Sequence, residues 1–220
     1  MVVKFTKLEH PGGIYVYRVH NEKLNKFCNF NPEFLKLKKY VHAMLEECPN
    51  DYFGNGPRGS CLKFKTNNQI IELKGHQVCN FAKNGLEVNS MRFKNNHSKV
   101  QLFMLENDDN TVAVEVPIWM QADELPGYQK LFGSAAPLTG HIDVLGFDND
   151  KIWVWDYKPN AHKEKYADTQ VYFYSMMLSK RTGIPLDKFM CGYFDAQRAY
   201  IFKPEPIENK EIFNKSLKVY

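Results

Sequence analysis

Two apolar segments that each contain a single aspartate constrain the fold of this chain most. The segments 140–147 (GHIDVLGF) and 151–157 (KIWVWDY) are rich in β-branched and aromatic residues, which predicts two strands. The residues between them, 148–150 (DND), are typical of a tight turn, so we expect a hairpin. A carboxylate inside such a strand is costly to bury unless a cation or a metal ion compensates it. Asp143 and Asp156 are therefore candidate functional residues.

The geometry of strands predicts that these side chains meet. Residues two apart share a face, so Asp156 and Lys158 point the same way, about 6.5–7 Å apart along the chain. A hairpin would bring Asp143 to about 5 Å across the neighbouring strand. Hard oxygen ligands of this kind suit Mg²⁺ or Mn²⁺. Glu115, the lone acid in the apolar run 112–117 (VAVEVP), would complete a site for one or two divalent ions.

The rest of the chain predicts alternating helices and strands, which indicates an α/β fold. Helices are expected at 31–48, 75–86 and 161–181, and further strands at 14–19, 69–74, 100–105, 111–119, 189–194 and 199–203. The residues 107–110 (NDDN) predict a hairpin between the third and fourth of those strands. The segment 49–60 (PNDYFGNGPRGS) is typical of a loop, mobile unless a ligand binds it, and 117–140 is expected to be a connection or flap.

Charge is divided unevenly along the chain. The net charge of +4 is composed of +8 over residues 1–105 and −4 over residues 106–220. The basic half indicates contact with a polyanion, although a solvated basic surface is an equally good reading of charge alone. No apolar run of about 18 residues occurs, and residues 1–13 lack the apolar stretch of a signal peptide, so we expect an intracellular, cytoplasmic protein with no membrane partner.

At the spacings found here, the acidic residues and a later helix resemble a known family. Asp143, the Asp156-Tyr157-Lys158 tripeptide thirteen residues later and the Gln170-x-x-x-Tyr174 pair look like the core of the PD-(D/E)XK nuclease superfamily. Within it they resemble the RecB-like branch, which includes the nuclease domains of RecB-type recombination exonucleases and the CRISPR-associated adaptation nucleases. The resemblance covers about residues 111–203.

The resemblance implies a fold and a division of the chain. It implies a restriction-endonuclease-like core, a central mixed β-sheet flanked by helices, over residues 99–220. Residues 1–98 would then form an N-terminal α+β extension that packs on the core and guides DNA.

The resemblance also implies a set of metal ligands. Asp143 and Asp156 would bind Mg²⁺ or Mn²⁺, the Tyr157 carbonyl would be a further ligand, and Glu115 matches an upstream acid that often adds one. RecB-like nucleases often carry a metal-binding histidine in a G-x-x-x-H setting. In this chain the corresponding segment 75–79 (GHQVC) has Cys79 at that place.

For two histidines, the sequence leaves open whether they bind the metal ion. His76, three residues before Cys79, is either a ligand or a surface residue of its helix, and His141 either approaches the metal or forms a hydrogen bond nearby. The iron–sulfur form of the family needs several cysteines after the Q-x-x-x-Y helix. Only Cys191 lies there, so no iron–sulfur cluster is expected.

The remaining implied roles concern water and DNA. Lys158 would orient or help deprotonate the attacking water, and Gln170 and Tyr174, on one face of a helix, would support the site and touch the DNA backbone. The basic half offers side chains for salt-dependent, largely sequence-independent contacts with DNA, namely Lys36, Lys39, Arg58, Lys63, Lys65 and Lys74.

Together these features predict a metal-dependent DNA nuclease. An exonuclease of DNA replication, recombination or repair that acts on single strands or duplex ends is the first hypothesis. A structure-specific or restriction-like endonuclease and a non-catalytic DNA-binding module with a nuclease fold remain alternatives. No G-x-x-x-x-G-K-[ST] phosphate-binding loop occurs, so a helicase or recombination partner would be a separate protein.

Overall fold

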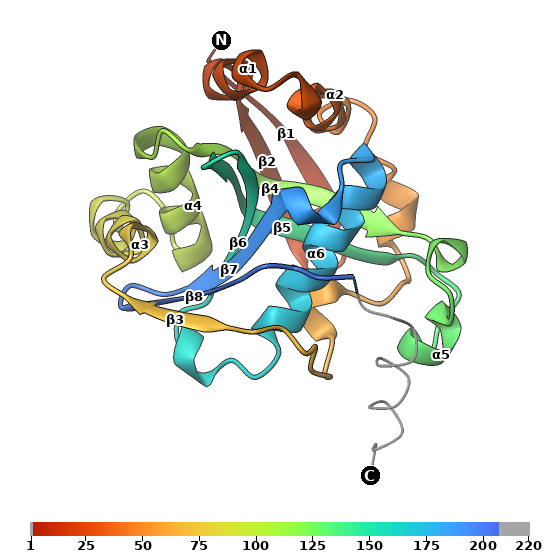
Figure 1. The fold of residues 1–220 in the computed structure, drawn as a ribbon. Coiled ribbons are helices and arrows are strands. Elements are labelled where there is room, and N and C mark those ends of the chain that lie inside the picture. Colours follow the sequence, from red (N-terminus) through yellow and green to blue (C-terminus); the bar gives the residue numbers. More distant parts are fainter. Residues whose placement is uncertain (1, 207–220) are drawn as a thin grey trace.

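A computed structural model describes residues 2–206 and contains one mixed sheet of eight strands flanked by helices (Figure 1). The strand order is β1-β2-β4-β5-β6-β7-β8-β3. The strands are β1 (Val3–His10), β2 (Gly13–His20), β3 (Ile71–Lys74), β4 (Thr111–Met120), β5 (Leu138–Asp148), β6 (Lys151–Tyr157), β7 (Phe189–Phe194) and β8 (Arg198–Phe202). The helices are α1 (Asn21–Phe30), α2 (Leu35–Ala43), α3 (Gln77–Val88), α4 (Asn96–Asn107), α5 (Tyr128–Phe132) and α6 (Ala167–Thr182). The predicted α/β class and mixed sheet are confirmed.

The hairpin formed by β5 and β6 lies at the centre of the sheet. Asn149 and Asp150 both have positive φ angles, 49° and 57°, the conformation that lets a two-residue turn match the twist of its strands. Val144 pairs with Trp155 and Leu145 with Val154, so the register places Asp143 across from Asp156. The hairpin predicted from the turn residues 148–150 is confirmed.

Helices bury both faces of the sheet. α6 joins β6 to the parallel strand β7, and its apolar residues Val171, Phe173 and Leu178 belong to the larger of two buried clusters. α3 and α4 cover the opposite face, where the second cluster forms (Figure 1). α6 ends at Gly183, whose φ of 65° is the left-handed conformation that a C-terminal glycine supplies without strain. The central strands β4, β5, β6 and β7 therefore have both faces buried, whereas the edge strands β1 and β3 are largely exposed.

The segment expected to be a strand at 100–105 is instead the middle of α4, and that prediction was wrong. Asn95 caps the helix by accepting a hydrogen bond from the backbone N–H of His97 at 2.8 Å. Short apolar runs do not distinguish a buried strand from a buried helix, and the cap and packing decide for the helix. Residues 107–110 consequently join a helix to β4 and do not form a hairpin.

The remaining expectations differ mainly at element boundaries. The strands expected at 14–19, 69–74, 111–119, 189–194 and 199–203 and the helix at 75–86 are confirmed as β2, β3, β4, β7, β8 and α3. The helix expected at 31–48 is a 3₁₀ turn (Pro32–Phe34) followed by α2, and the helix expected at 161–181 begins only at Ala167. β1 and α1 were not predicted.

The N-terminal region contributes strands to both edges of the sheet. β2 pairs with β4, and β3 pairs with β8, so strands from both sides of residue 98 share one sheet. The boundary at residue 98 stays a prediction. Among the helices of residues 2–206, none combines the length and the apolarity that a membrane crossing requires.

Candidate active site

Asp143 and Asp156 face one another at the centre of the sheet, and both are nearly inaccessible, with 8% and 2% of their surfaces exposed. The backbone N–H of Tyr157 donates to Asp143 Oδ2 at 2.9 Å. Lys158 follows the last residue of β6 but stays aligned with the sheet, because its N–H donates to the carbonyl of Phe194 at 2.8 Å. The structure thus brings together the aspartates and the lysine that the sequence singled out.

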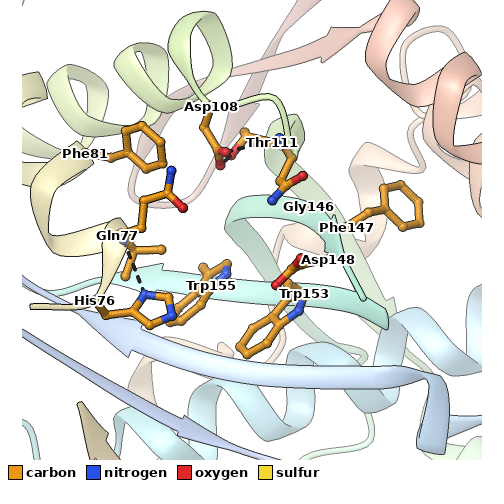
Figure 2. A pocket seen from close by; sticks show the side chains of 12 residues that line it. His76, Gln77, Phe81, Asp108, Thr111, Gly146, Phe147, Asp148, Trp153 and Trp155 are labelled. Atoms are coloured by element: carbon orange, nitrogen blue, oxygen red, sulfur yellow. Dashed lines mark hydrogen bonds between the residues drawn. The ribbon is translucent and has the colours of Figure 1, made fainter. Parts of the chain in front are cut away.

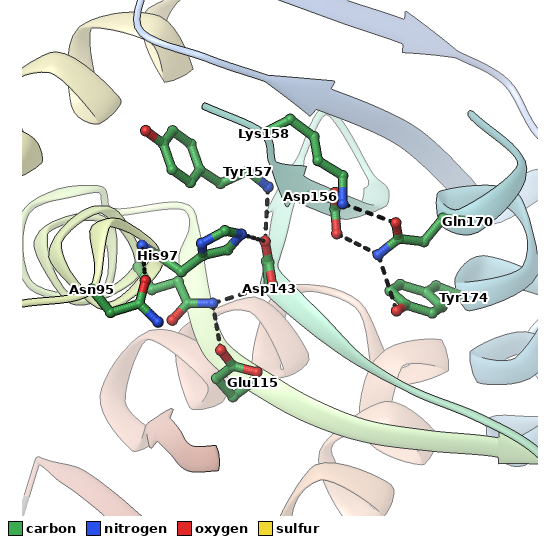
Figure 3. A network of polar contacts seen from close by, with 10 residues as sticks. Asn95, His97, Glu115, Asp143, Asp156, Tyr157, Lys158, Gln170 and Tyr174 are labelled. Atoms are coloured by element: carbon green, nitrogen blue, oxygen red, sulfur yellow. Dashed lines mark hydrogen bonds and ion pairs between the residues drawn. The ribbon is translucent and has the colours of Figure 1, made fainter. Parts of the chain in front are cut away.

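One glutamine side chain connects the second aspartate, the lysine and a tyrosine (Figure 3). Gln170 Nε2 donates to Asp156 Oδ1 at 2.8 Å and to the hydroxyl of Tyr174 at 3.0 Å. Its carbonyl oxygen accepts from Lys158 Nζ at 2.9 Å, and that ammonium lies 2.8 Å from Asp156 Oδ2. Both amide hydrogens and the amide oxygen of Gln170 are therefore engaged, which fixes the orientation of the carboxylate and the ammonium.

The ring of Tyr174 is held between two glycines. A Cβ atom added at Gly140 or at Gly59 would lie 2.3 Å from the Tyr174 ring, so a side chain at either position displaces it. Gly59 belongs to the segment 49–60, which the sequence predicts to be a loop. The N–H of Thr139 donates to the carbonyl of Pro57 at 3.0 Å, which anchors this loop on the start of β5.

Replacing Gly140 by alanine is expected to destabilise the protein by about 1–3 kcal/mol, because the added methyl group overpacks a buried ring. Urea unfolding measures the effect. Gly54→Ala is the matched control, since its added Cβ meets nothing closer than a carbonyl oxygen at 3.5 Å. Equal stability of the two variants would contradict the tight packing of Tyr174.

Glu115 reaches the same site through an irregularity in β4. Val114 pairs with Val144 and Val116 with Ile142, which places Glu115 across from Asp143. The φ angle of Glu115 is 56°, a left-handed conformation that is uncommon for a residue with a side chain. Strained conformations of this kind cluster at active sites. The Glu115 carboxylate faces α4, where Gln101 donates to it.

Two residues of α4 that the sequence analysis missed complete the polar network. Gln101 Nε2 donates to Glu115 Oε1 at 2.8 Å and to Asp143 Oδ1 at 3.3 Å. His97 Nε2 lies 3.7 Å from Asp143 Oδ2, with its ring edge-on to Tyr157 (Figure 3). The signal that could have found them is Asn95, an N-cap residue that stands five positions before the apolar run beginning at Val100.

The two histidines proposed from sequence lie elsewhere. His76 caps α3, and its ring centroid is 5.6 Å from that of Trp155, in a pocket apart from the carboxylates. His141 Nε2 is 2.9 Å from His10 Nδ1, and its ring stacks on Tyr15. The imidazole nearest to Asp143 among the described contacts is that of His97.

Burial and mutual repulsion raise the pKa values of two of the acids. Burial, followed by the negative charge of Asp143, raises the pKa of Glu115 to about 8, although the hydrogen bond from Gln101 opposes this. Burial, followed by the charge of Asp156, raises the pKa of Asp143 to about 6. Burial lowers the pKa of Lys158, but Asp156 and Asp143 outweigh burial and the net shift is upward. The site therefore holds more negative charge than its own cations neutralise.

The types of side chain present fit a divalent cation. Three carboxylates and one imidazole are the oxygen and nitrogen donors that Mg²⁺ or Mn²⁺ accepts, and the upward pKa shifts mark a place where added positive charge is favourable. Within residues 2–206 no three acidic, histidine or cysteine side chains already stand in ligand geometry. The carboxylate oxygens contact the amides of Gln101 and Gln170 and the ammonium of Lys158. Asp143, Asp156 and Glu115 would turn from these donors to hold an ion.

The raised pKa of Glu115 predicts a pH-dependent stability difference. Between about pH 4.5 and 8 the unfolded chain loses this proton while the metal-free folded chain keeps it, so the group destabilises the fold increasingly as pH rises. In EDTA, we expect the free energy of unfolding of Glu115→Gln minus that of the wild-type protein to increase as pH rises from about 4.5 to 8. Urea unfolding across pH measures it, with Glu87→Gln on the exposed face of α3 as the charge control. A difference that is constant with pH would contradict the shift.

The basic residues singled out from sequence do not gather at one place. Lys36 and Lys39 are exposed on α2, Lys63 and Lys65 are exposed before β3, and Lys74 is exposed at the end of β3. Arg58 is half-buried and donates to the hydroxyl of Tyr15. Its positive charge contributes to the pKa shifts of Tyr174 and His141, and the neighbouring Gly59 packs on Tyr174, so Arg58 lies beside the site.

A comparison with protein families identifies the superfamily of this chain. The family model described as "PD-(D/E)XK nuclease superfamily" matches residues 39–217, and this chain belongs to that superfamily. The family consists of nucleases, which generally use divalent metal ions. Membership in the family implies that DNA is the substrate. No curated protein matches the chain.

One solved structure gives a weaker likeness. It is described as "Crystal structure of SSO0001" and is 14% identical, with 87% of this chain and 85% of that chain covered at a TM-score of 0.36.

Proposed function

We propose that this protein is a metal-dependent deoxyribonuclease that hydrolyses phosphodiester bonds with Mg²⁺ or Mn²⁺. The observation that carries the proposal is the facing pair Asp143 and Asp156, with the Lys158 ammonium 2.8 Å from the second carboxylate. Phosphodiester hydrolysis needs a place where negative charge accumulates on phosphate oxygens and is neutralised. Two buried carboxylates beside a fixed ammonium supply the ligands and part of that neutralisation.

The residues of the site have different roles in this proposed reaction. Asp143 and Asp156, with Glu115 and the Tyr157 carbonyl, would hold the ion. When bound, a divalent ion lowers the pKa of its water and stabilises charge on the phosphate. Lys158 is held by Gln170 with its ammonium directed at Asp156, so it can orient the attacking water and contact a phosphate oxygen. Gln170 and Tyr174 act as positioning residues that keep this arrangement fixed.

We further propose that the chain belongs to the RecB-like branch and that His97 serves as its metal-binding histidine. The support is the 3.7 Å separation between His97 Nε2 and Asp143 Oδ2 together with the Gln170–Tyr174 hydrogen bond. His76 is the rival from sequence, and its side chain is used as a helix cap in a separate pocket.

Replacing His97 by alanine is expected to weaken Mn²⁺ binding at least about tenfold, on the scale known for residues that support a metal site. Isothermal titration of the whole protein measures the change. His76→Ala is the matched control, for which we expect unchanged affinity. The reverse result, a loss in His76→Ala alone, would assign the ligand to His76.

An exonuclease acting on single strands or duplex ends in replication, recombination or repair is the form of the activity that we propose. The test is cleavage of end-labelled linear and closed-circular DNA with Mg²⁺, Mn²⁺ or EDTA. Degradation of linear DNA alone supports the exonuclease, and nicking of circular DNA would assign an endonuclease instead. DNA binding without cleavage under any metal would assign a non-catalytic module.

A further inference from the structure

The pocket that contains His76 opens on the face of the sheet covered by α3 and α4, apart from the carboxylates. It lies between the start of α3, the turn from α4 to β4 and the end of the β5–β6 hairpin (Figure 2). The cavity volume of the pocket is about 110 Å³. A single water needs roughly 10–15 Å³ on this measure, so the space admits a small group such as one planar ring system. The activity proposed above does not use it.

Aromatic side chains form the floor of this pocket. The indole rings of Trp153 and Trp155 stack with centroids 4.8 Å apart and an angle of 8° between their planes. Trp155 is buried and Trp153 is half-buried, and the ring of His76 stands 5.6 Å from that of Trp155. Flat aromatic walls favour a flat aromatic ligand, because stacking of bases on such side chains is favourable for every base.

The polar groups of the pocket favour a ligand that both accepts and donates hydrogen bonds. The indole N–H of Trp153 is buried and has no hydrogen-bond partner within the part of the chain that the structure describes, so it lacks an acceptor. Asp148 and Gln77, both exposed at the mouth, offer oxygens that accept hydrogen bonds. A phosphate would be repelled by Asp108 and Asp148, and a simple cation would leave the indole N–H unpaired. A nucleobase has a neutral ring with both acceptors and donors.

α4 connects the pocket to the carboxylate site. His97 stands in its first turn beside Asp143, and Asp108, which lines the pocket, follows its last residue. Eleven residues of helix span about 16 Å, which corresponds to about five nucleotides of a stacked strand at 3.4 Å each. Lys74, exposed two residues before His76, is placed to meet a neighbouring phosphate.

We propose that this pocket binds one base of the nucleic-acid strand held at the carboxylate site, about five nucleotides from the bond that is cleaved. This inference rests on the proposed nuclease function. The base stacks on the Trp153 ring and accepts a hydrogen bond from its N–H, while exocyclic amino groups of the base donate to Gln77 or Asp148. The pocket would thereby fix the register of the strand without reading a long sequence.

The experiment uses the whole protein with Ca²⁺, an ion that also accepts carboxylate oxygens, and a set of fluorescently labelled single-stranded 12-mers, each lacking the base at one position. Anisotropy titrations give the affinity for each strand. In the original protein we expect one abasic position to weaken binding roughly 5- to 150-fold, the range that base–aromatic stacking gives. Trp153→Ala should abolish the penalty at that position and leave the other positions as they were.

A second variant guards against a folding defect in Trp153→Ala. Gln77→Trp fills the pocket mouth from an exposed position of α3 and should also remove the penalty, whereas Asn84→Trp, exposed on the same helix but outside the pocket, should not. The inference is overturned if no position carries a penalty, if the penalty persists in both pocket variants, or if free nucleosides bind the pocket as tightly as the strand.

Cleavage is mapped separately with Mg²⁺. Absence of a cleavage product would refute the proposed nuclease activity, whereas the loss of affinity for the abasic strands reports on the pocket alone. Failure of the proposed activity and failure of the proposed base site are therefore distinguishable.

Discussion

Replacing Asp156 by asparagine is expected to lower the rate of metal-dependent DNA cleavage at least about 10³-fold. Asp156 is 2% exposed and holds both Lys158 and Gln170, so the change removes a ligand charge at the centre of the network. A bound divalent ion contributes several kcal/mol to such a reaction, and each 1.36 kcal/mol is a factor of ten in rate. Initial rates on a labelled strand with saturating Mg²⁺ or Mn²⁺ measure the loss.

The control for this variant is the same substitution outside the site. Asp150→Asn lies in the β5–β6 turn, where a positive φ angle is one that asparagine tolerates, and it should retain the original rate. Circular dichroism and thermal unfolding check that Asp156→Asn is folded. A carefully repurified Asp156→Asn protein that cleaves at the original rate would remove Asp156 from the mechanism.

Replacing Lys158 by alanine is expected to reduce the rate of DNA cleavage by about 10²-fold or more. It is also expected to lower the stability of the metal-free protein. Without the ammonium, Asp156 remains buried across from Asp143 with no cation beside it. Loss of one partner of a buried ion pair costs about 3–5 kcal/mol. In EDTA the variant should therefore unfold at lower urea concentration. Added Mn²⁺ should restore much of the stability but not the rate, because an ion at the carboxylates does not replace the donor that faces the phosphate.

Two further variants separate charge from geometry at this position. Lys158→Arg keeps the charge but carries a planar fork in place of a compact ammonium, so we expect the rate to stay low. Lys151→Ala removes a lysine from the same strand, whose ammonium donates to the carbonyl of Asp187 at 2.9 Å, and should leave cleavage unchanged. If Lys158→Ala retained full activity, the role of the ammonium would be refuted.

Local sequence was sufficient to predict the central hairpin and the helix that supports the site. The turn residues 148–150 and the length of each strand set the register, and this register places Asp143 across from Asp156. The spacing of Gln170 and Tyr174 places both on one face of α6, where Gln170 Nε2 reaches the tyrosine hydroxyl. These features depend on residues close together in the chain, whose periodicity and turn chemistry can be read directly.

Tertiary packing decided the rest of the site. The apolar run 100–105 is compatible with a strand or a helix, and its burial in the cluster with Val78, Ala82 and Trp155 selects the helix that brings His97 and Gln101 to the carboxylates. The bend at Glu115 and the seating of Gly59 on Tyr174 likewise join segments far apart in sequence. The sequence by itself determined which carboxylates and which lysine could form the site, because strand and helix periods are local. Only the tertiary structure decided which imidazole, amide and loop complete it, because those contacts depend on how distant surfaces pack together.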